Sequence, residues 1–239
     1  MRRMGRILAA AALACLAAGG TAIAARSAAR PSALKRDWAK VVVATPEGGF
    51  RMGNPNAAVK LIEYGSLTCP HCAHFESEGV PALVQNYVRT GKLSYEFRNF
   101  VRDPYDLTAA LLSRCAGPRR YFPMTHEIFA TQDQWTGRFA KLSASDYDAL
   151  EAMAPTPKVI RIAGIAGLDA MAARYGVPAP RAKACLSDAA GVKRLTDMRQ
   201  VAVTKFELQG TPTFVINGRK ADGAAAWATL EPLLKAQGG

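Results

Sequence analysis

The sequence has few of the residues from which metal and haem sites are built. It contains five cysteines and three histidines in 239 residues. A structural zinc site needs a second cysteine or histidine pair spaced like Cys69 and Cys72, whereas Cys115 and Cys185 each stand alone. Covalent haem attachment needs Cys-x-x-Cys-His, but Ala73 occupies the histidine position. Attached haem is therefore excluded and zinc is disfavoured, and we expect no metal, flavin or nucleotide cofactor.

Acidic residues are also scarce relative to basic ones. The chain has 19 Asp and Glu against 31 Lys and Arg, which gives a formal net charge of +12. A basic chain can bind nucleic acid, anionic membranes or acidic partners. The Lys and Arg residues are scattered, however, without interleaved aromatic residues or a nucleic-acid-binding motif. We therefore expect a solvated basic surface and no nucleic-acid partner.

The N-terminal residues have the composition of a targeting segment. Three arginines within the first six residues precede an apolar stretch over residues 7–18. Gly19-Gly20 and then Ala22-Ile23-Ala24 follow, and the latter has the small-x-small form of a cleavage site. We predict a signal peptide over 1–24 and export to the periplasm, an oxidising compartment. An uncleaved membrane anchor is the weaker alternative, because the apolar stretch is short.

Strand and helix patterns alternate along the rest of the chain. They predict, in order, a hairpin (41–43 and 50–52), a strand (59–65), a helix (70–89), a strand (93–97), a helical block (104–188), a helix (189–207), a strand (213–216), a tight turn at Asn217-Gly218 and a closing helix (227–235). This order predicts an α/β chain with a thioredoxin-like fold and an inserted all-helical domain. The thioredoxin-like domain would span 41–103 and 189–239, the inserted domain 104–188, and a flexible segment 25–40. The tryptophans have apolar surroundings and are expected in the core: Trp38, Trp135 and Trp227.

The most informative segment is Cys69-Pro70-His71-Cys72. It follows the apolar strand at 59–65 and begins a helix, because proline fits the first helical position. Cys69 then lies at a helix N-terminus, where unpaired N–H groups and the helix dipole favour a thiolate. Thiol pKa values at such positions fall from about 8.5 to roughly 3.5–7.5, and a protonated His71 would add a second cationic influence. A stabilised thiolate stabilises the reduced form, so the disulfide form is an oxidant. The alternative is a purely structural disulfide.

The other cysteines predict a second disulfide. Cys15 lies in the predicted signal peptide, which leaves four cysteines in the exported chain. Once Cys69 and Cys72 are paired, Cys115 and Cys185 remain as a structural disulfide of the kind common in exported proteins. The alternative is two separate buried thiols.

Several motifs of the chain resemble the DsbA-like branch of the thioredoxin superfamily, which comprises exported bacterial thiol–disulfide oxidoreductases. The resemblance spans residues 50–237. Leu67-Thr68-Cys69-Pro70-His71-Cys72 is similar to the active-site turn of that branch, and Gly210-Thr211-Pro212-Thr213-Phe214 to its cis-proline loop. Glu63, six residues before Cys69, is similar to the buried acidic residue of the superfamily. A disulfide between Cys115 and Cys185 resembles a subset in which the helical domain has its own disulfide.

The resemblance implies a role for each matching residue. Cys69 would be the exposed, attacking sulfur and Cys72 the shielded, resolving thiol. Pro212 would be cis and would place the Thr211 backbone beside the disulfide. Glu63 would be buried, with a raised pKa, and would carry the proton of Cys72; the alternative is a solvated carboxylate. Pro70 and His71 complete the predicted site.

The resemblance also implies a function. We expect an exported dithiol oxidase that introduces disulfides into folding exported polypeptides and is reoxidised by a membrane partner. Thr211 departs from the Val of the best-known oxidases and is typical of isomerases and reductases, so isomerase or reductase activity is the alternative. The segment before residue 50 is too short for the dimerisation domain of those isomerases, which predicts a monomer. Alternatives from other classes are a metal carrier using Cys69, Cys72 and His74, and a peptide-binding chaperone.

Overall fold

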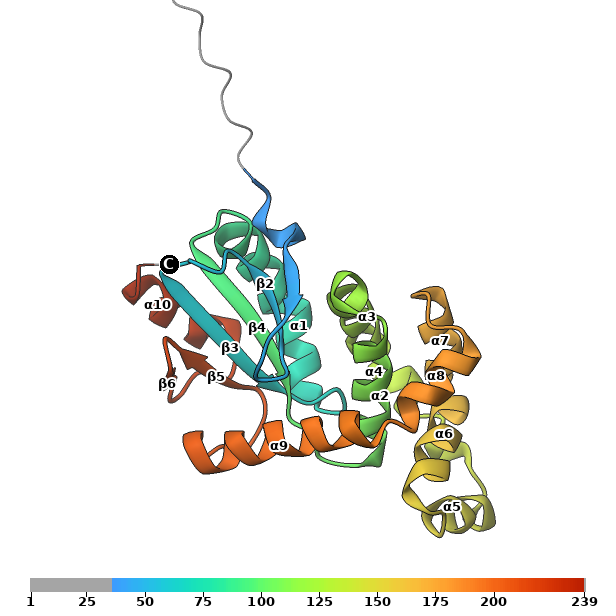
Figure 1. Ribbon diagram of the computed structural model, residues 1–239. Helices are drawn as coiled ribbons and strands as arrows, with labels where there is room; N and C mark the ends of the chain where they lie inside the picture. The colour runs from blue at the N-terminus through green and yellow to red at the C-terminus, as the bar shows by residue number, and fades with distance from the viewer. Residues whose placement is uncertain (1–35, 239) are drawn as a thin grey trace, which may run out of the picture. The chain divides into compact units, whose positions relative to one another are not determined.

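The computed structural model describes residues 36–238 (Figure 1). The predicted signal peptide over 1–24, and residues 25–35 of the predicted flexible segment, lie outside the described residues. At the start of the described chain, Trp38–Lys40 forms a short 3₁₀ helix, η1. The Trp38 N–H donates to the Arg89 carbonyl at 3.3 Å, which ties η1 to the sheet domain.

Within residues 36–238, a single sheet of six strands organises the fold. Its spatial order is β1-β2-β4-β3-β5-β6, and only the central pair, β3 and β4, is parallel. The strands are β1 (Val42–Ala44), β2 (Phe50–Gly53), β3 (Val59–Gly65), β4 (Leu93–Asn99), β5 (Thr213–Ile216) and β6 (Arg219–Lys220). The predicted hairpin is β1–β2. The predicted tight turn joins β5 to β6, and Asn217 and Gly218 both have the positive φ that a two-residue hairpin of this kind requires (49° and 83°).

Successive residues of β3 point to opposite faces of the sheet. Glu63 is the cross-strand partner of Phe214, whose ring lies 4.7 Å from that of Phe75 in α1 (Pro70–Leu83). The next residue, Tyr64, has its ring 5.8 Å from that of Phe206 in α9 (Ala189–Phe206). Helices α1 and α9 therefore cover the two faces of the sheet at the end of β3.

The helices between β4 and α9 form the predicted helical block, and two further helical segments, η2 (Val84–Val88) and α10 (Trp227–Ala236), belong to the rest of the chain. Helix α1 continues as the π-helix η2 shortly after Pro81, and α10 ends the described chain. The block between β4 and α9 consists of α2 (Pro104–Cys115), α3 (Pro118–Ala130), α4 (Gln132–Thr136), η3 (Phe139–Lys141), α5 (Ala144–Glu151), α6 (Pro155–Ala166), α7 (Leu168–Arg174) and α8 (Ala179–Leu186). In Figure 1 these helices gather on one side of the sheet, and α9 leads from them back to it. Residues 36–238 form one compact unit, so the division into two domains stays a prediction.

The predicted disulfide between Cys115 and Cys185 is present and joins the end of α2 to α8. This confirms that feature of the resemblance. Both residues belong to the helical block, so the disulfide constrains that block rather than the sheet.

The prediction that all three tryptophans are core residues is wrong for two of them. Trp135 is buried, with 2% of its surface exposed. Trp38 and Trp227 are only partly buried, although Trp227 packs against the core and its ring lies 6.0 Å from that of Tyr87. No helix within residues 36–238 has both the length and the apolarity needed to cross a membrane.

Candidate active site

Strand β3 delivers the Cys-x-x-Cys segment to the start of α1. Cys69 is the N-cap residue of this helix, in extended conformation, and Pro70 is its first residue. Cys72 lies one turn inside the helix and has none of its surface exposed. Cys69 is 3% exposed, so the expectation of an exposed attacking sulfur is wrong for this structure.

The loop before β5 covers Cys69. The Thr211–Pro212 peptide bond is cis, as predicted. The Cys69 thiol donates a hydrogen bond to the Thr211 carbonyl oxygen at 3.2 Å, over a separation of 142 residues. This contact places the backbone of the cis-proline loop directly beside the Cys69 sulfur, which it helps to cover.

The Thr211 side chain has an unexpected arrangement. Its hydroxyl is buried and has no hydrogen-bond partner of normal geometry within the described residues. The side chain nevertheless is among the groups that lower the pKa of Cys69. The aligned hydrogen bond to sulfur is therefore made by the Thr211 carbonyl, which accepts from the thiol. The hydroxyl close by is left without a partner while Cys69 is protonated.

The local environment strongly favours the Cys69 thiolate. Hydrogen bonding from the Cys72 thiol lowers the pKa of Cys69 most, and burial opposes it. The Thr211 side chain and the backbone N–H groups of Cys72 and His71 add to the lowering, which brings the pKa to about 5. These N–H groups belong to the first turn of α1, where no intrahelical acceptor exists for them.

The environment of Cys72, in contrast, favours the protonated thiol. Burial raises the pKa of the Cys72 thiol well above its ordinary value, and its hydrogen bond to Cys69 and the charge of Glu63 raise it further. The Ser66 N–H, which donates to the Cys72 sulfur at 3.5 Å, partly offsets this rise. At neutral pH the pair therefore holds one thiolate, at Cys69, and one proton, at Cys72.

Glu63 is buried beneath this pair, with 1% of its surface exposed. Burial raises its pKa to about 8, although the Tyr95 hydroxyl donates to the carboxylate at 2.6 Å and opposes the rise. The alternative of a solvated carboxylate is thus wrong. A carboxyl group that titrates near neutral pH suits proton transfer, so the role of Glu63 as proton carrier for Cys72 stays a proposal that this environment favours.

A second buried carboxyl group adjoins the site and was not predicted from the sequence. Asp106, in the first turn of α2, is fully buried and accepts hydrogen bonds from the Ser66 hydroxyl and the Leu67 N–H. Burial raises its pKa to about 7, against the lowering effect of the Ser66 hydroxyl. The sequence does contain Asp103-Pro104, a typical helix start, but nothing local indicates that α2 begins against the active-site loop.

The histidines lie at the surface. His71 is exposed beside Cys69, and His74 pairs with Glu78 at 3.1 Å on the exposed side of α1. Within residues 36–238, no group of three or more His, Cys, Asp or Glu side chains is arranged to hold a metal ion.

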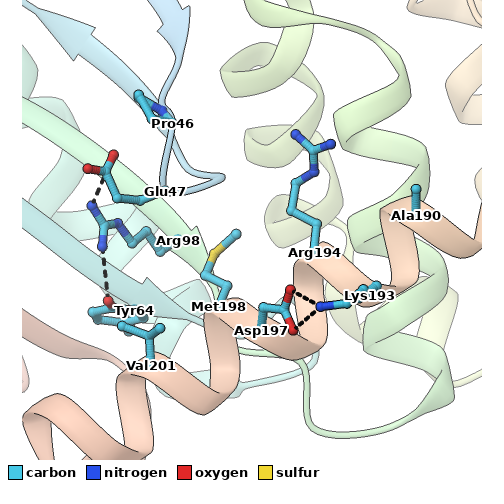
Figure 2. Close-up of a pocket in the computed structure, with 10 residues that line it drawn as sticks. All are labelled: Pro46, Glu47, Tyr64, Arg98, Ala190, Lys193, Arg194, Asp197, Met198 and Val201. Atoms are coloured by element: carbon cyan, nitrogen blue, oxygen red, sulfur yellow. Dashed lines mark hydrogen bonds and ion pairs between the residues drawn. The ribbon is translucent and has the colours of Figure 1, made fainter.

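A separate cavity of about 380 Å³ lies against α9, on the other face of the sheet (Figure 2). Figure 2 shows Arg98 between Glu47 and the Tyr64 hydroxyl, and Lys193 paired with Asp197 on α9. Neither Cys69 nor Cys72 lines this cavity. It is therefore not part of the cysteine site.

Comparison with known families shows to which protein family the chain belongs. A family model described as thioredoxin matches residues 45–236. The chain belongs to this thioredoxin family. The match covers the Cys-x-x-Cys segment, the helical block and the cis-proline loop, as the resemblance to DsbA-like proteins implied.

Relatives of this thioredoxin-family chain include proteins that are named as disulfide oxidoreductases. A protein of Rickettsia bellii named "Putative protein-disulfide oxidoreductase" is 30% identical over 180 residues, which are 75% of this chain and 61% of the relative. The chain thus spans about three-fifths of the length of that relative.

Solved structures show the same fold. A protein-disulfide isomerase from Novosphingobium aromaticivorans is 34% identical and superimposes with a TM-score of 0.73, covering 78% of this chain and 95% of that one. The alpha-DsbA1 of Wolbachia pipientis is 25% identical with a TM-score of 0.60, covering 82% and 92%. The thioredoxin-like fold and the DsbA-like resemblance are therefore both confirmed.

Proposed function

We propose that the protein is an exported protein-disulfide oxidoreductase that acts as a dithiol oxidase. The observation that carries this proposal is the asymmetry of the two cysteines. The environment of Cys69 lowers its thiol pKa to about 5, whereas Cys72 keeps its proton. A stabilised Cys69 thiolate makes the reduced form favourable, so the Cys69–Cys72 disulfide is a strong acceptor of electrons.

The reaction follows from the geometry. A substrate thiolate attacks the Cys69 sulfur, forms a substrate–Cys69 disulfide and breaks the Cys69–Cys72 bond, so that Cys72 leaves with the electron pair. A second substrate thiolate then attacks the substrate sulfur of this mixed disulfide and releases Cys69 as a thiolate. The substrate gains a disulfide and loses two electrons, which the protein retains as a dithiol.

The neighbouring groups serve these steps. Glu63, with a pKa of about 8, holds a proton at neutral pH and supplies it to Cys72 as that sulfur leaves. The cis-proline loop presents the Thr211 backbone beside Cys69, where an extended substrate polypeptide can pair with it. In the dithiol form the Cys69 residue is only 3% exposed and its thiol donates to the Thr211 carbonyl; a substrate meets the disulfide form, in which Cys69 has no proton with which to make this bond.

Isomerase activity is the second candidate, and two observations favour it. Threonine precedes the cis-proline, as in isomerases and reductases of the DsbA-like branch. The Novosphingobium structure, which is 34% identical to this chain, is described as a protein-disulfide isomerase. We favour the oxidase because the low pKa of Cys69 stabilises the dithiol form.

Location and partners complete the proposal. The basic N-terminus with its cleavage-site pattern supports export to the periplasm, where folding polypeptides with free thiols are the substrates. Catalytic turnover requires an electron acceptor for the reduced form, and we propose a membrane-bound redox partner for that role. We propose that the protein acts as a monomer.

Two assays test the proposal. The oxidised protein should convert a reduced two-cysteine peptide to its disulfide, and Cys69→Ser should abolish this activity. In parallel, refolding of a scrambled disulfide protein should be slow. Faster unscrambling than dithiol oxidation would favour the isomerase, and no reaction in either assay would overturn the oxidoreductase proposal.

A further inference from the structure

Helix α2 holds the loop that precedes the cysteines through Asp106. The Oδ2 atom of Asp106 accepts from the Ser66 hydroxyl at 2.6 Å and from the Arg102 N–H at 3.1 Å. The Oδ1 atom accepts from the Leu67 N–H at 2.9 Å. None of the surface of Asp106 is exposed, so water does not compete for these hydrogen bonds.

The loop held in this way contacts the resolving cysteine. Ser66 donates its backbone N–H to the Cys72 sulfur at 3.5 Å. Two further hydrogen bonds fix this loop: the Arg102 Nε–H donates to the Ser66 oxygen at 2.8 Å, and the Thr68 hydroxyl donates to Asp103 at 3.0 Å. Asp106 does not bond to either sulfur itself, and it reaches Cys72 only through Ser66.

We propose that Asp106 is a positioning residue for Cys72, because it holds Ser66 so that the Ser66 N–H points at the Cys72 sulfur whenever that sulfur carries negative charge. This inference rests on the proposed redox function of the cysteine pair. It assigns the helical block a direct part in the chemistry, since the first turn of α2 sets the position of a donor at the redox centre.

The reaction with glutathione disulfide separates the two cysteines. In the first step, the Cys69 thiolate attacks one glutathione sulfur, forms a Cys69–glutathione disulfide and releases one glutathione thiolate. In the second step, Cys72 gives up its proton, attacks the Cys69 sulfur and closes the Cys69–Cys72 disulfide; the second glutathione leaves with the electron pair and takes up that proton. The protein loses the two electrons that glutathione disulfide gains. Only the second step places charge on Cys72.

The variant Asp106→Asn is nearly isosteric and tests the acceptor role. All three groups that face the carboxylate donate hydrogen bonds, namely the Ser66 hydroxyl and the N–H groups of Leu67 and Arg102. An asparagine must turn its NH₂ group toward at least one of these donors, so the cluster cannot stay fully paired. We expect Ser66 to shift and its N–H to lose its alignment with Cys72.

The experiment mixes reduced protein with glutathione disulfide at pH 8, where Asp106, whose pKa burial raises to about 7, is mostly ionised. It quenches with acid at intervals and counts mixed-disulfide and disulfide species by mass spectrometry. We expect Asp106→Asn to slow the second step about tenfold and to change the first step less than about twofold, because only the second depends on the position of Ser66. The matched control is Asp146→Asn. Asp146 is likewise the third residue of a helix and accepts from a serine hydroxyl, Ser143, at 2.7 Å, but it is exposed. The Asp146→Asn variant should therefore leave the rates of both steps unchanged.

A second variant, Ser66→Ala, tests the proposal if Asp106→Asn does not fold. Ser66→Ala keeps the backbone N–H and removes only the hydroxyl that Asp106 and Arg102 hold, so it should also slow the second step selectively. A second step at the wild-type rate in either folded variant would overturn the proposal, as would equal slowing of both steps. Failure of the wild-type protein to react with glutathione disulfide at all would instead contradict the proposed function.

Discussion

Cys69 and Cys72 lie one helical turn apart, yet the pKa of the Cys69 thiol is lowered and that of the Cys72 thiol is raised. Hydrogen bonding from the Cys72 thiol lowers the pKa of Cys69 most, and smaller contributions from the Thr211 side chain and the first-turn N–H groups help to bring it to about 5. Cys72 is inside the helix and fully buried, and its main donor is the Ser66 N–H. Three residues of sequence therefore separate a stable anion from a stable thiol, and this difference makes the pair asymmetric in reaction.

The first prediction concerns the Cys69 thiolate and the Thr211 hydroxyl. Thiolate absorbance at 240 nm in the reduced protein should titrate with a midpoint of about 5 and should be lost in Cys69→Ser. In Thr211→Val we expect a higher midpoint, by less than about one unit or roughly 1.4 kcal/mol, because the unpartnered hydroxyl can turn toward the sulfur once it is ionised.

The matched control for this variant is Thr213→Val. Thr213 lies two residues away, and its hydroxyl donates to the Gly210 carbonyl at 2.7 Å instead of facing the cysteines. It should leave the titration unchanged. A Thr211→Val curve identical to that of the wild type would show that the hydroxyl does not act on the thiolate.

The second prediction concerns Glu63 and pH. Its pKa is raised to about 8 in the folded protein, from an ordinary value of 4.5 in the unfolded chain. The protonated form is therefore favoured by folding, and this contribution to stability is full below the unfolded pKa and is lost as pH rises through about 8. Glu63→Gln should remove the dependence and become more stable than the wild type at pH 8, by on the order of a few kcal/mol.

Urea unfolding of both proteins at several pH values between 4 and 9 measures this difference. The pKa of Asp106 is also raised, but both proteins contain this residue, so its contribution to the pH dependence cancels in the comparison. Equal pH slopes for wild type and Glu63→Gln would mean that Glu63 is not buried as a neutral acid.

At the scale of the elements, the local patterns predicted most of the fold. Strand β5 and the Asn217-Gly218 turn occur where alternation and turn residues placed them. Strand β4 runs two residues beyond its predicted end, because Arg98 and Asn99 are buried and pair with β3 although they are polar. The last turn of the helix after Pro81 became a π-helix, a departure in hydrogen bonding that no periodicity reveals.

The third prediction tests the Cys115–Cys185 disulfide. The two cysteines are 70 residues apart, so cross-linking constrains a long loop of the unfolded chain. Replacing both by serine should lower the free energy of unfolding by about 4 kcal/mol and leave the reduction potential of Cys69 and Cys72 unchanged. Unchanged stability would show that the disulfide contributes nothing to the folded state, and a shifted potential would show that the helical block tunes the redox pair through it.

At the scale of the whole molecule, the site combines segments that are distant in the sequence. The Cys-x-x-Cys motif identified Cys69 and Cys72 as candidate site residues. The resemblance then pointed to Glu63 and the cis-proline loop. Asp106 and Gln132 could not be found in this way. Gln132, in α4, donates to the Leu67 and Cys69 carbonyls at 2.9 and 3.1 Å across more than 60 residues, and contacts of that range depend on how the helical block packs. The resemblance placed the Thr211 backbone beside the disulfide, but it did not predict that Cys69 would be only 3% exposed.

The fourth prediction addresses the metal-carrier alternative. The reduced protein should carry no stoichiometric zinc or copper after gel filtration, because among residues 36–238 no two further ligands converge on Cys69 and Cys72, and His74 pairs with Glu78. Elemental analysis of wild type and Cys69→Ser decides this. A metal content of one per chain that disappears in the variant would favour the carrier.

The reduction potential of the Cys69–Cys72 couple tests the central proposal most directly. Equilibration in glutathione buffers, read out by alkylation and mass spectrometry, gives this potential, with Cys69→Ser as the control that cannot form the disulfide. A dithiol oxidase with a stabilised Cys69 thiolate should have a potential closer to about −120 mV than to the value of about −270 mV for a reductant such as thioredoxin. A value near −270 mV would contradict the oxidase and would make the protein a reductase.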